Sequence, residues 1–142
     1  MELYRIIYLS KMSVETQRED IIDLIDTSKK NNQNRGLTGM LMFSNKNFMQ
    51  ILEGDVLQLN RTFESIMQDN RHHEIYMLEY VRISRRLFGD WEMKLVSLDD
   101  YVIPRTIQLQ VEGSLFAPFP RDKDLALELL LNIKHKIQPS FA

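Results

Sequence analysis

The sequence predicts an α+β sandwich of the ferredoxin-like type, in which two helices cover one face of a mixed sheet and a helical tail follows. Three observations lead to this prediction. Short β-prone segments and amphipathic helices alternate in the order βαββαββ up to Leu98. Beyond that residue, proline-bounded and leucine-rich segments replace the alternation. The chain has 142 residues, which suits one domain with a moderate core.

A strand and a helix open the predicted sandwich. Residues 3–9 are β-prone, and Ser13 is a candidate N-cap for a helix that begins at Val14. Toward the C-terminal end of this helix, its apolar stripe is continued by three polar residues: Ser28, Asn31 and Asn32. Gly36 then provides the helix stop. The core-facing side of the helix therefore becomes polar.

The remaining strands and the second helix follow at close spacing. Residues 37–52 predict a hairpin with a tight turn at 44–47. Asp55 resembles the first residue of a capping box, which indicates that a helix follows it directly. Two further strands are expected at residues 75–83 and 91–96. The order of strands and helices is complete at this point.

The tail is predicted to be helical. Residues 104–111 form a candidate short helix, and residues 122–137 a strong one. Apolar residues occupy more than one face of the second helix, so we expect it to pack against the domain and against another surface. We divide the chain into a domain of residues 1–98 and an extension of residues 99–142 for output or oligomerisation.

Composition and charge disfavour several classes of function. A formal net charge of -2 gives no electrostatic reason to expect nucleic acid or an anionic membrane as a partner. The sequence contains no cysteine, begins without a signal peptide and has no long apolar run, so a cytoplasmic location is expected. His72 and His73 are adjacent and seldom share a face, so we expect no metal site.

Two enzyme or binding classes built on similar topologies also lack support. A small acyl-phosphate hydrolase needs a phosphate cradle, but residues 10–13 contain neither glycine nor arginine. RNA binding would call for an aromatic and basic strand motif, which the sequence does not contain.

Two polar residues, Tyr8 and Gln50, interrupt segments that otherwise have the composition of buried strands. Burying an amide or a phenol without a hydrogen bond costs about 1–3 kcal/mol, so each requires a polar partner. In the predicted architecture these side chains converge with the polar end of the first helix and with Trp91 and Met93 of the last strand. The set offers donors and acceptors but no acid–base dyad, which favours recognition of a planar heterocycle over hydrolysis.

Five motifs occur in an order that resembles the BLUF family of flavin-based blue-light sensors, over about residues 1–98. The motifs are Arg5-Ile6-Ile7-Tyr8-Leu9-Ser10; Ser28-x-x-Asn31-Asn32 with Gly36-Leu37-Thr38-Gly39-Met40-Leu41; Phe48-Met49-Gln50-Ile51-Leu52-Glu53-Gly54; Asp69-x-Arg71-His72; and Trp91-x-Met93-x-Leu95. The family's ferredoxin-like fold, with a flavin between two helices, agrees with the predicted order of elements. The short tail resembles that of stand-alone members without an enzymatic output domain.

The resemblance implies a role for each matching residue. Tyr8 matches the tyrosine that gives an electron and a proton to the excited flavin, and Gln50 matches the amide whose rearrangement produces a red-shifted signalling state. The residues that match or suit the flavin site are Leu24, Ser28, Asn31, Asn32, Leu41, Phe48, Gln50, Ile66, Asp69, Arg71 and His72. Trp91 and Met93 match the pair associated with signalling through the last strand.

The resemblance also sets expectations for cofactor and partners. FAD is the family's usual cofactor, and FMN or riboflavin would also fit a site built around the ring. We expect no enzymatic activity, a downstream response protein and, from the apolar tail, a homo-oligomer. The alternative is a ferredoxin-like interaction or regulatory module without photochemistry.

Overall fold

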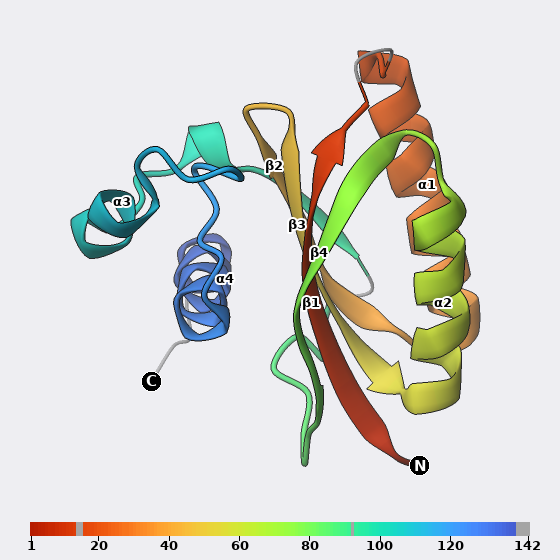
Figure 1. The fold of residues 1–142 in the computed structure, drawn as a ribbon. Coiled ribbons are helices and arrows are strands. Elements are labelled where there is room, and N and C mark those ends of the chain that lie inside the picture. Colours follow the sequence, from red (N-terminus) through yellow and green to blue (C-terminus); the bar gives the residue numbers. More distant parts are fainter. Residues whose placement is uncertain (14–15, 92, 139–142) are drawn as a thin grey trace.

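The computed structural model describes residues 1–13, 16–91 and 93–138, and its core element is a five-stranded sheet (Figure 1). The strands lie in the order β4-β1-β3-β2-β5, antiparallel except for the parallel pair β2 and β5. The strands are β1 (Leu3–Met12), β2 (Thr38–Ser44), β3 (Asn47–Asp55), β4 (His72–Arg82) and β5 (Lys94–Ser97). The helices are α1 (Arg18–Arg35), α2 (Val56–Gln68), α3 (Arg105–Val111) and α4 (Lys123–Ile137), with a short 3-10 turn at Leu98–Asp100.

The predicted fold class is confirmed. Helices α1 and α2 cover one face of the mixed sheet, while α3 and α4 lie on the other side (Figure 1). The hairpin turn is also present, with left-handed φ values of 50° at Asn45 and 63° at Lys46, as a two-residue hairpin loop requires. Gly36 caps α1 with a φ of 66°.

Several element boundaries differ from the prediction. Helix α1 begins at Arg18, because Gln17 and Asp20 form the capping box, while the Ser13 hydroxyl donates to the Asn70 carbonyl instead. Val14 lies outside the described residues. Strand β5 covers only Lys94–Ser97, so Trp91 and Met93 precede it.

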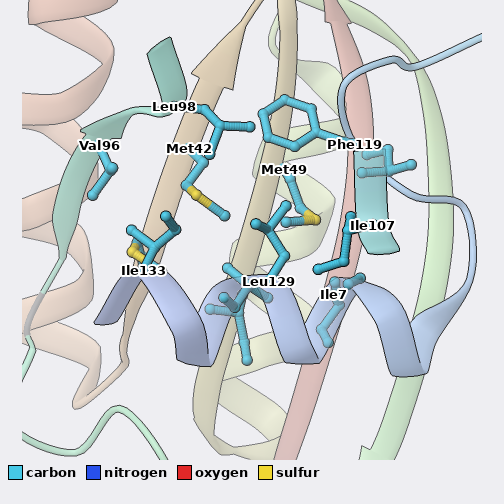
Figure 2. Packing of buried hydrophobic residues seen from close by; sticks show 14 of the residues in the cluster. Ile7, Met42, Met49, Val96, Leu98, Ile107, Phe119, Leu129 and Ile133 are labelled. Atoms are coloured by element: carbon cyan, nitrogen blue, oxygen red, sulfur yellow. The ribbon is translucent and has the colours of Figure 1, made fainter. Parts of the chain in front are cut away.

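Each face of the sheet has its own apolar core. On the α1 and α2 side, residues such as Ile6, Leu52 and Leu59 are fully buried. On the other side, Leu129 and Ile133 of α4 pack over strand residues such as Met49 (Figure 2). The apolar faces of α4 are thus used within the chain, because α3 and the loop before α4 join the same cluster. Leu131 keeps 36% of its surface exposed.

Candidate functional site

Tyr8 and Gln50 form a buried hydrogen-bonded pair in the middle of the sheet. They are directly opposite each other on the antiparallel strands β1 and β3. The Tyr8 hydroxyl donates to Gln50 Oε1, and the two side chains are 3% and 4% exposed. Each residue therefore supplies the polar partner that the burial of the other requires.

The second end of the Gln50 amide faces Met93. Gln50 Nε2 donates to Met93 Sδ at 3.6 Å. A thioether sulfur is a weak acceptor, so this end is held less firmly than the end that meets Tyr8. Gln50 therefore links the β1–β3 pair to the segment that enters β5.

Two adjoining hollows lie between α1, α2 and the sheet, beside this pair. Their volumes are about 130 Å³ and about 30 Å³. The smaller hollow is lined by Tyr8, Leu24, Ser28, Leu41, Phe48, Gln50, Ile66, Asp69 and His72. The larger one adds polar residues of both helices, which are Thr27, Asn31, Asn32, Arg35, Thr62 and Ser65, and Arg71 from the turn before β4. Larger hollows of about 550 Å³ and 640 Å³ exist elsewhere, but neither contains Tyr8, Gln50 or Asn32.

Asn32 has an unpaired donor in this cavity. The residue is 2% exposed, and its Nδ2 atom has no hydrogen-bond partner among the described residues. An unsatisfied buried amide costs about 1–3 kcal/mol, and a ligand with an acceptor at this position would recover part of that cost. Its neighbour Asn31 is exposed, and Ser28 is half-buried. The C-terminal end of α1 thus offers hydrogen-bond donors both inside the cavity, from Asn32, and nearer to solvent, from Ser28 and Asn31.

An ion pair lies at one side of the cavity. Arg71 Nη2 is 2.6 Å from Asp69 Oδ2, and Arg71 Nε is 2.9 Å from Asp69 Oδ1. These hydrogen bonds lower the pKa of the Asp69 carboxyl below its usual value and raise the pKa of Arg71. Asp69 therefore stays ionised and places a fixed negative charge beside the hollow.

That environment keeps Tyr8 protonated. Burial raises the pKa of the Tyr8 phenol far above its usual value, and the negative charge of Asp69 adds to the shift. A phenolate is thus strongly disfavoured at this position. The hydroxyl remains available as the donor to Gln50.

His72 lines the small hollow but directs both ring nitrogens into the protein. Nδ1 lies 2.9 Å from Ser10 Oγ, and Nε2 lies 2.7 Å from the Ile66 carbonyl oxygen. Because a carbonyl can only accept, Nε2 donates and Nδ1 accepts from the serine when the ring is neutral. Burial lowers the pKa of His72, which favours this neutral form.

The structure places Trp91 and Met93 in different apolar cores, although the sequence pattern placed both beside Tyr8 and Gln50. Met93 lies on the α1 and α2 side, within reach of Gln50. Trp91 belongs to the core on the α4 side, packs against Phe88 and donates from Nε1 to Gln138 Oε1 at 2.6 Å. The predicted convergence of Trp91 with Tyr8 and Gln50 is therefore wrong for this structure. Both residues precede β5, so strand alternation does not fix their directions.

Sequence reasoning missed four polar residues of the cavity lining, which are Thr27, Arg35, Thr62 and Ser65. Arg35 Nη1 donates to Thr62 Oγ1 at 2.8 Å and so bridges the two helices. Helical spacing was the available signal, because Arg35 follows Asn32 by three positions and Thr62 precedes Ile66 by four.

Comparison with known proteins identifies the family. The family described as "Sensors of blue-light using FAD" matches residues 3–94. The chain belongs to the BLUF family. It is a flavin-binding blue-light sensor with the ferredoxin-like fold of that family.

Several relatives illustrate this membership. The chain is 30% identical over 96 residues to the blue light- and temperature-regulated antirepressor BluF of Escherichia coli, covering 68% of this chain and 24% of that protein. It is also 30% identical over 117 residues to the photoactivated adenylate cyclase subunit beta of Euglena longa, covering 79% of this chain and only 14% of that relative. The dark-state structure of BlrB, a BLUF protein, superimposes with a TM-score of 0.77 at 25% identity, covering 96% and 97% of the two chains.

Two general features complete the description. None of the helices in the described part of the chain is long and apolar enough to cross a bilayer. Within residues 1–13, 16–91 and 93–138, no cluster of His, Asp or Glu side chains is arranged to hold a metal ion.

Proposed function

We propose that Tyr8 is the light-driven electron and proton donor of this sensor, and that Gln50 stores the result as a rearranged set of hydrogen bonds. The buried Tyr8–Gln50 pair, beside a cavity with an unpaired Asn32 donor, carries this proposal. When bound, a flavin absorbs the blue light and accepts the electron and proton. Burial keeps the Tyr8 phenol protonated. An oxidised phenol is a strong acid, so loss of an electron from Tyr8 is coupled to loss of its proton.

Gln50 suits the storage role because its amide is asymmetric. Oε1 accepts from Tyr8, and Nε2 meets only a weak acceptor in Met93. Rotation or tautomerisation of the amide would exchange donor and acceptor without moving net charge. Such a change would strengthen a hydrogen bond to the flavin carbonyl and shift its absorption to the red.

The cavity residues are proposed to hold the ring in two ways. The buried amide of Asn32, with Asn31 and Ser28, supplies donors to the polar edge of the ring. The apolar walls of the smaller hollow are Leu24, Leu41, Phe48 and Ile66. The Asp69–Arg71 ion pair lies on the cavity side, while His72 braces the site through Ser10 and Ile66.

Entry of a tricyclic ring requires the cavity to widen. The two hollows of about 130 Å³ and 30 Å³ are smaller than the usual ligand pocket of about 300 Å³ or more. The bridge from Arg35 to Thr62 spans α1 and α2 at this cavity, with Arg35 half-buried and Thr62 buried. We infer that this bridge opens when the flavin binds. We also infer that the flavin is FAD, because the description of the family names FAD.

The signal is proposed to leave the site through Met93 and Trp91 and to reach α3 and α4. Met93 contacts Gln50, whereas Trp91 contacts Gln138 directly after α4. The chain would then act in the cytoplasm on a downstream protein, without catalysis of its own. Residues 1–98 would be the sensor domain and residues 99–142 the output extension.

Absorption spectroscopy of the purified protein before and after blue light tests the sensor proposal. We expect a yellow protein whose flavin absorption shifts to the red under illumination and returns in the dark. Chromatography of the released cofactor is expected to identify FAD. A colourless protein that also refuses added FAD, FMN and riboflavin would support the alternative, an interaction module without photochemistry.

We also propose that the chain forms a homo-oligomer. Several large apolar side chains of the tail remain exposed, among them Val102 at 79% and Leu109 at 62%. Light scattering across micromolar concentrations is expected to give a mass above that of the 16.9 kDa chain. A monomer over the whole range would contradict this expectation.

A further inference from the structure

The loop between β4 and β5 crosses the whole sheet. These strands are the two edges in the order β4-β1-β3-β2-β5, so the connection between them, of which residues 83–91 and 93 are described, must cross the three central strands. The loop also contains both Trp91 and Met93. Its position therefore decides which contacts these two residues make.

A buried carboxylate of β3 holds this loop from below. Glu53 is fully buried, and its Oε1 accepts from the backbone N–H groups of Leu87 at 2.9 Å and Phe88 at 2.7 Å. Arg5 Nη1 lies 3.8 Å from Glu53 Oε2 and compensates the charge. Burying a carboxylate costs free energy. The presence of the buried Glu53 carboxylate beneath the loop therefore indicates that the loop has to be held in this position.

Helix α4 holds the same segment from above. Lys134 Nζ donates to the Leu87 carbonyl oxygen and lies 5.2 Å from the centroid of the Phe88 ring. Leu87 and Phe88 are thus fixed by Glu53 through their N–H groups, while α4 holds the Leu87 carbonyl and the Phe88 ring. A few residues later, Trp91 meets Gln138.

We propose that Glu53 is a positioning residue that fixes the β4–β5 loop, so that Met93 reaches Gln50 on one sheet face and Trp91 reaches Gln138 on the other. Glu53 follows Gln50 by three residues on β3, and the loop it anchors packs against α4, on the sheet face opposite to Gln50. Glu53 therefore fixes the loop at a point close to Gln50 on the same strand. This inference rests on the proposed roles of Gln50 and the tail.

The variant Glu53→Gln tests this inference, with Glu79→Gln as the matched control. The introduced amide would offer a single neutral oxygen in place of a charged carboxylate, whereas Glu79 pairs with the same Arg5 at 2.9 Å but does not hold the loop. Trp91 is the single tryptophan of the chain, so its emission reports directly on the loop. Hydrogen exchange of the amides of Lys123–Ile137 reports on the attachment of α4.

In the dark state of Glu53→Gln, we expect Trp91 emission at longer wavelength and exchange in α4 faster by about tenfold, the effect of replacing charge-assisted hydrogen bonds by weaker neutral ones. Recovery of the red-shifted state in the dark is expected to change rate as well. Glu79→Gln should match the wild type in all three measurements. Wild-type emission and exchange in Glu53→Gln, or an equal change in Glu79→Gln, would overturn the inference.

A second variant keeps the test decisive if Glu53→Gln does not fold. Lys134→Met removes the bond to the Leu87 carbonyl from the α4 side, and it too should accelerate exchange in α4. Unchanged exchange there would overturn the inference. Flavin content is measured in the same samples, so a failure of the flavin proposal is recognised separately, because Trp91 emission and amide exchange remain readable without flavin.

Discussion

The amide of Gln50 is held firmly at one end and weakly at the other. Oε1 receives the hydrogen bond from Tyr8, while Nε2 has only the sulfur of Met93 at 3.6 Å. Rotation of the amide by half a turn would therefore lose little hydrogen-bond energy at Met93. It would also replace the hydrogen bond that Oε1 accepts from Tyr8 by a different contact. Leucine or methionine at this position would fill the space but could not store two hydrogen-bonded states.

Removing either member of the pair should abolish the normal photoproduct without emptying the site. In Gln50→Leu and in Tyr8→Phe the shape is largely kept, and the other residues that line the cavity are untouched. We expect both variants to bind flavin but to lose the reversible red shift, as measured by difference spectra under blue light. Tyr76→Phe, at an exposed tyrosine, is the matched control and should behave as the wild type. A full, persistent red shift in Gln50→Leu would refute the assigned role.

The unpaired amide of Asn32 leads to a second prediction at this scale. Asn32→Ala removes a buried donor that has no hydrogen-bond partner among the described residues and that the proposed flavin would satisfy, so flavin affinity should fall by about 0.5–1.5 kcal/mol, or roughly 2- to 12-fold. The stability of the flavin-free protein should not fall by a comparable amount. Titration of apoprotein with flavin gives the first quantity, and thermal unfolding gives the second. The exposed Asn31 provides the comparison, and an equal loss in Asn31→Ala would argue against a special role for Asn32.

At the scale of elements, the order of strands and helices was predictable because hydrophobic periodicity differs between them. The start of α1 was not, because Ser13 and Gln17 both offer capping side chains and only the folded chain gives Ser13 another partner in Asn70. The start of β5 could not be predicted from the sequence either. Trp91 and Met93 alternate in sequence like strand residues, yet β5 begins at Lys94.

The contact between Tyr8 and Gln50 was predictable from the strand pattern together with the predicted arrangement of the strands. Tyr8 and Gln50 both interrupt apolar strands, and a polar residue buried on one strand needs a polar neighbour on the next. The role of Glu53 was not visible in the same way. Its hydrogen bonds go to backbone N–H groups of a distant loop, which have no sequence signature.

His72 joins three elements and should make the fold sensitive to acid. Its ring connects the start of β4 to Ser10 of β1 and to the Ile66 carbonyl of α2. Burial lowers its pKa in the folded state, so the unfolded chain takes up the proton first as the pH falls through about 6.5. The contribution of His72 to stability is therefore complete above this pH and is lost below it.

We expect His72→Gln to flatten this dependence. The free energy of unfolding of the wild type, measured by urea titration between about pH 7.5 and pH 5, should decrease toward the acid end. His72→Gln should reduce that slope, while His73→Gln, at the exposed neighbour, should keep it. An unchanged slope in His72→Gln would mean that other groups set the acid sensitivity.

At the scale of the whole molecule, the tail completes the fold. Helix α4 buries Ala126, Leu129, Leu130 and Ile133 in the same cluster as Met42 and Met49 of the sheet (Figure 2). Because α4 is packed in this way, it cannot leave the sheet without exposing a large apolar surface. Signals that reach α4 should therefore act by small shifts of a packed helix rather than by its release.

Leu129→Ala tests whether the tail and the sheet unfold as one unit. Leu129 is fully buried, so truncation should cost about 2–5 kcal/mol, whereas Leu131→Ala, at 36% exposure, should cost clearly less. Urea unfolding is followed by circular dichroism and by Trp91 emission, which senses the junction of the β4–β5 loop with Gln138. We expect a single coincident transition for both probes in the wild type and in each variant. Two separate transitions, with only the tail affected by Leu129→Ala, would show that the extension is an independent unit.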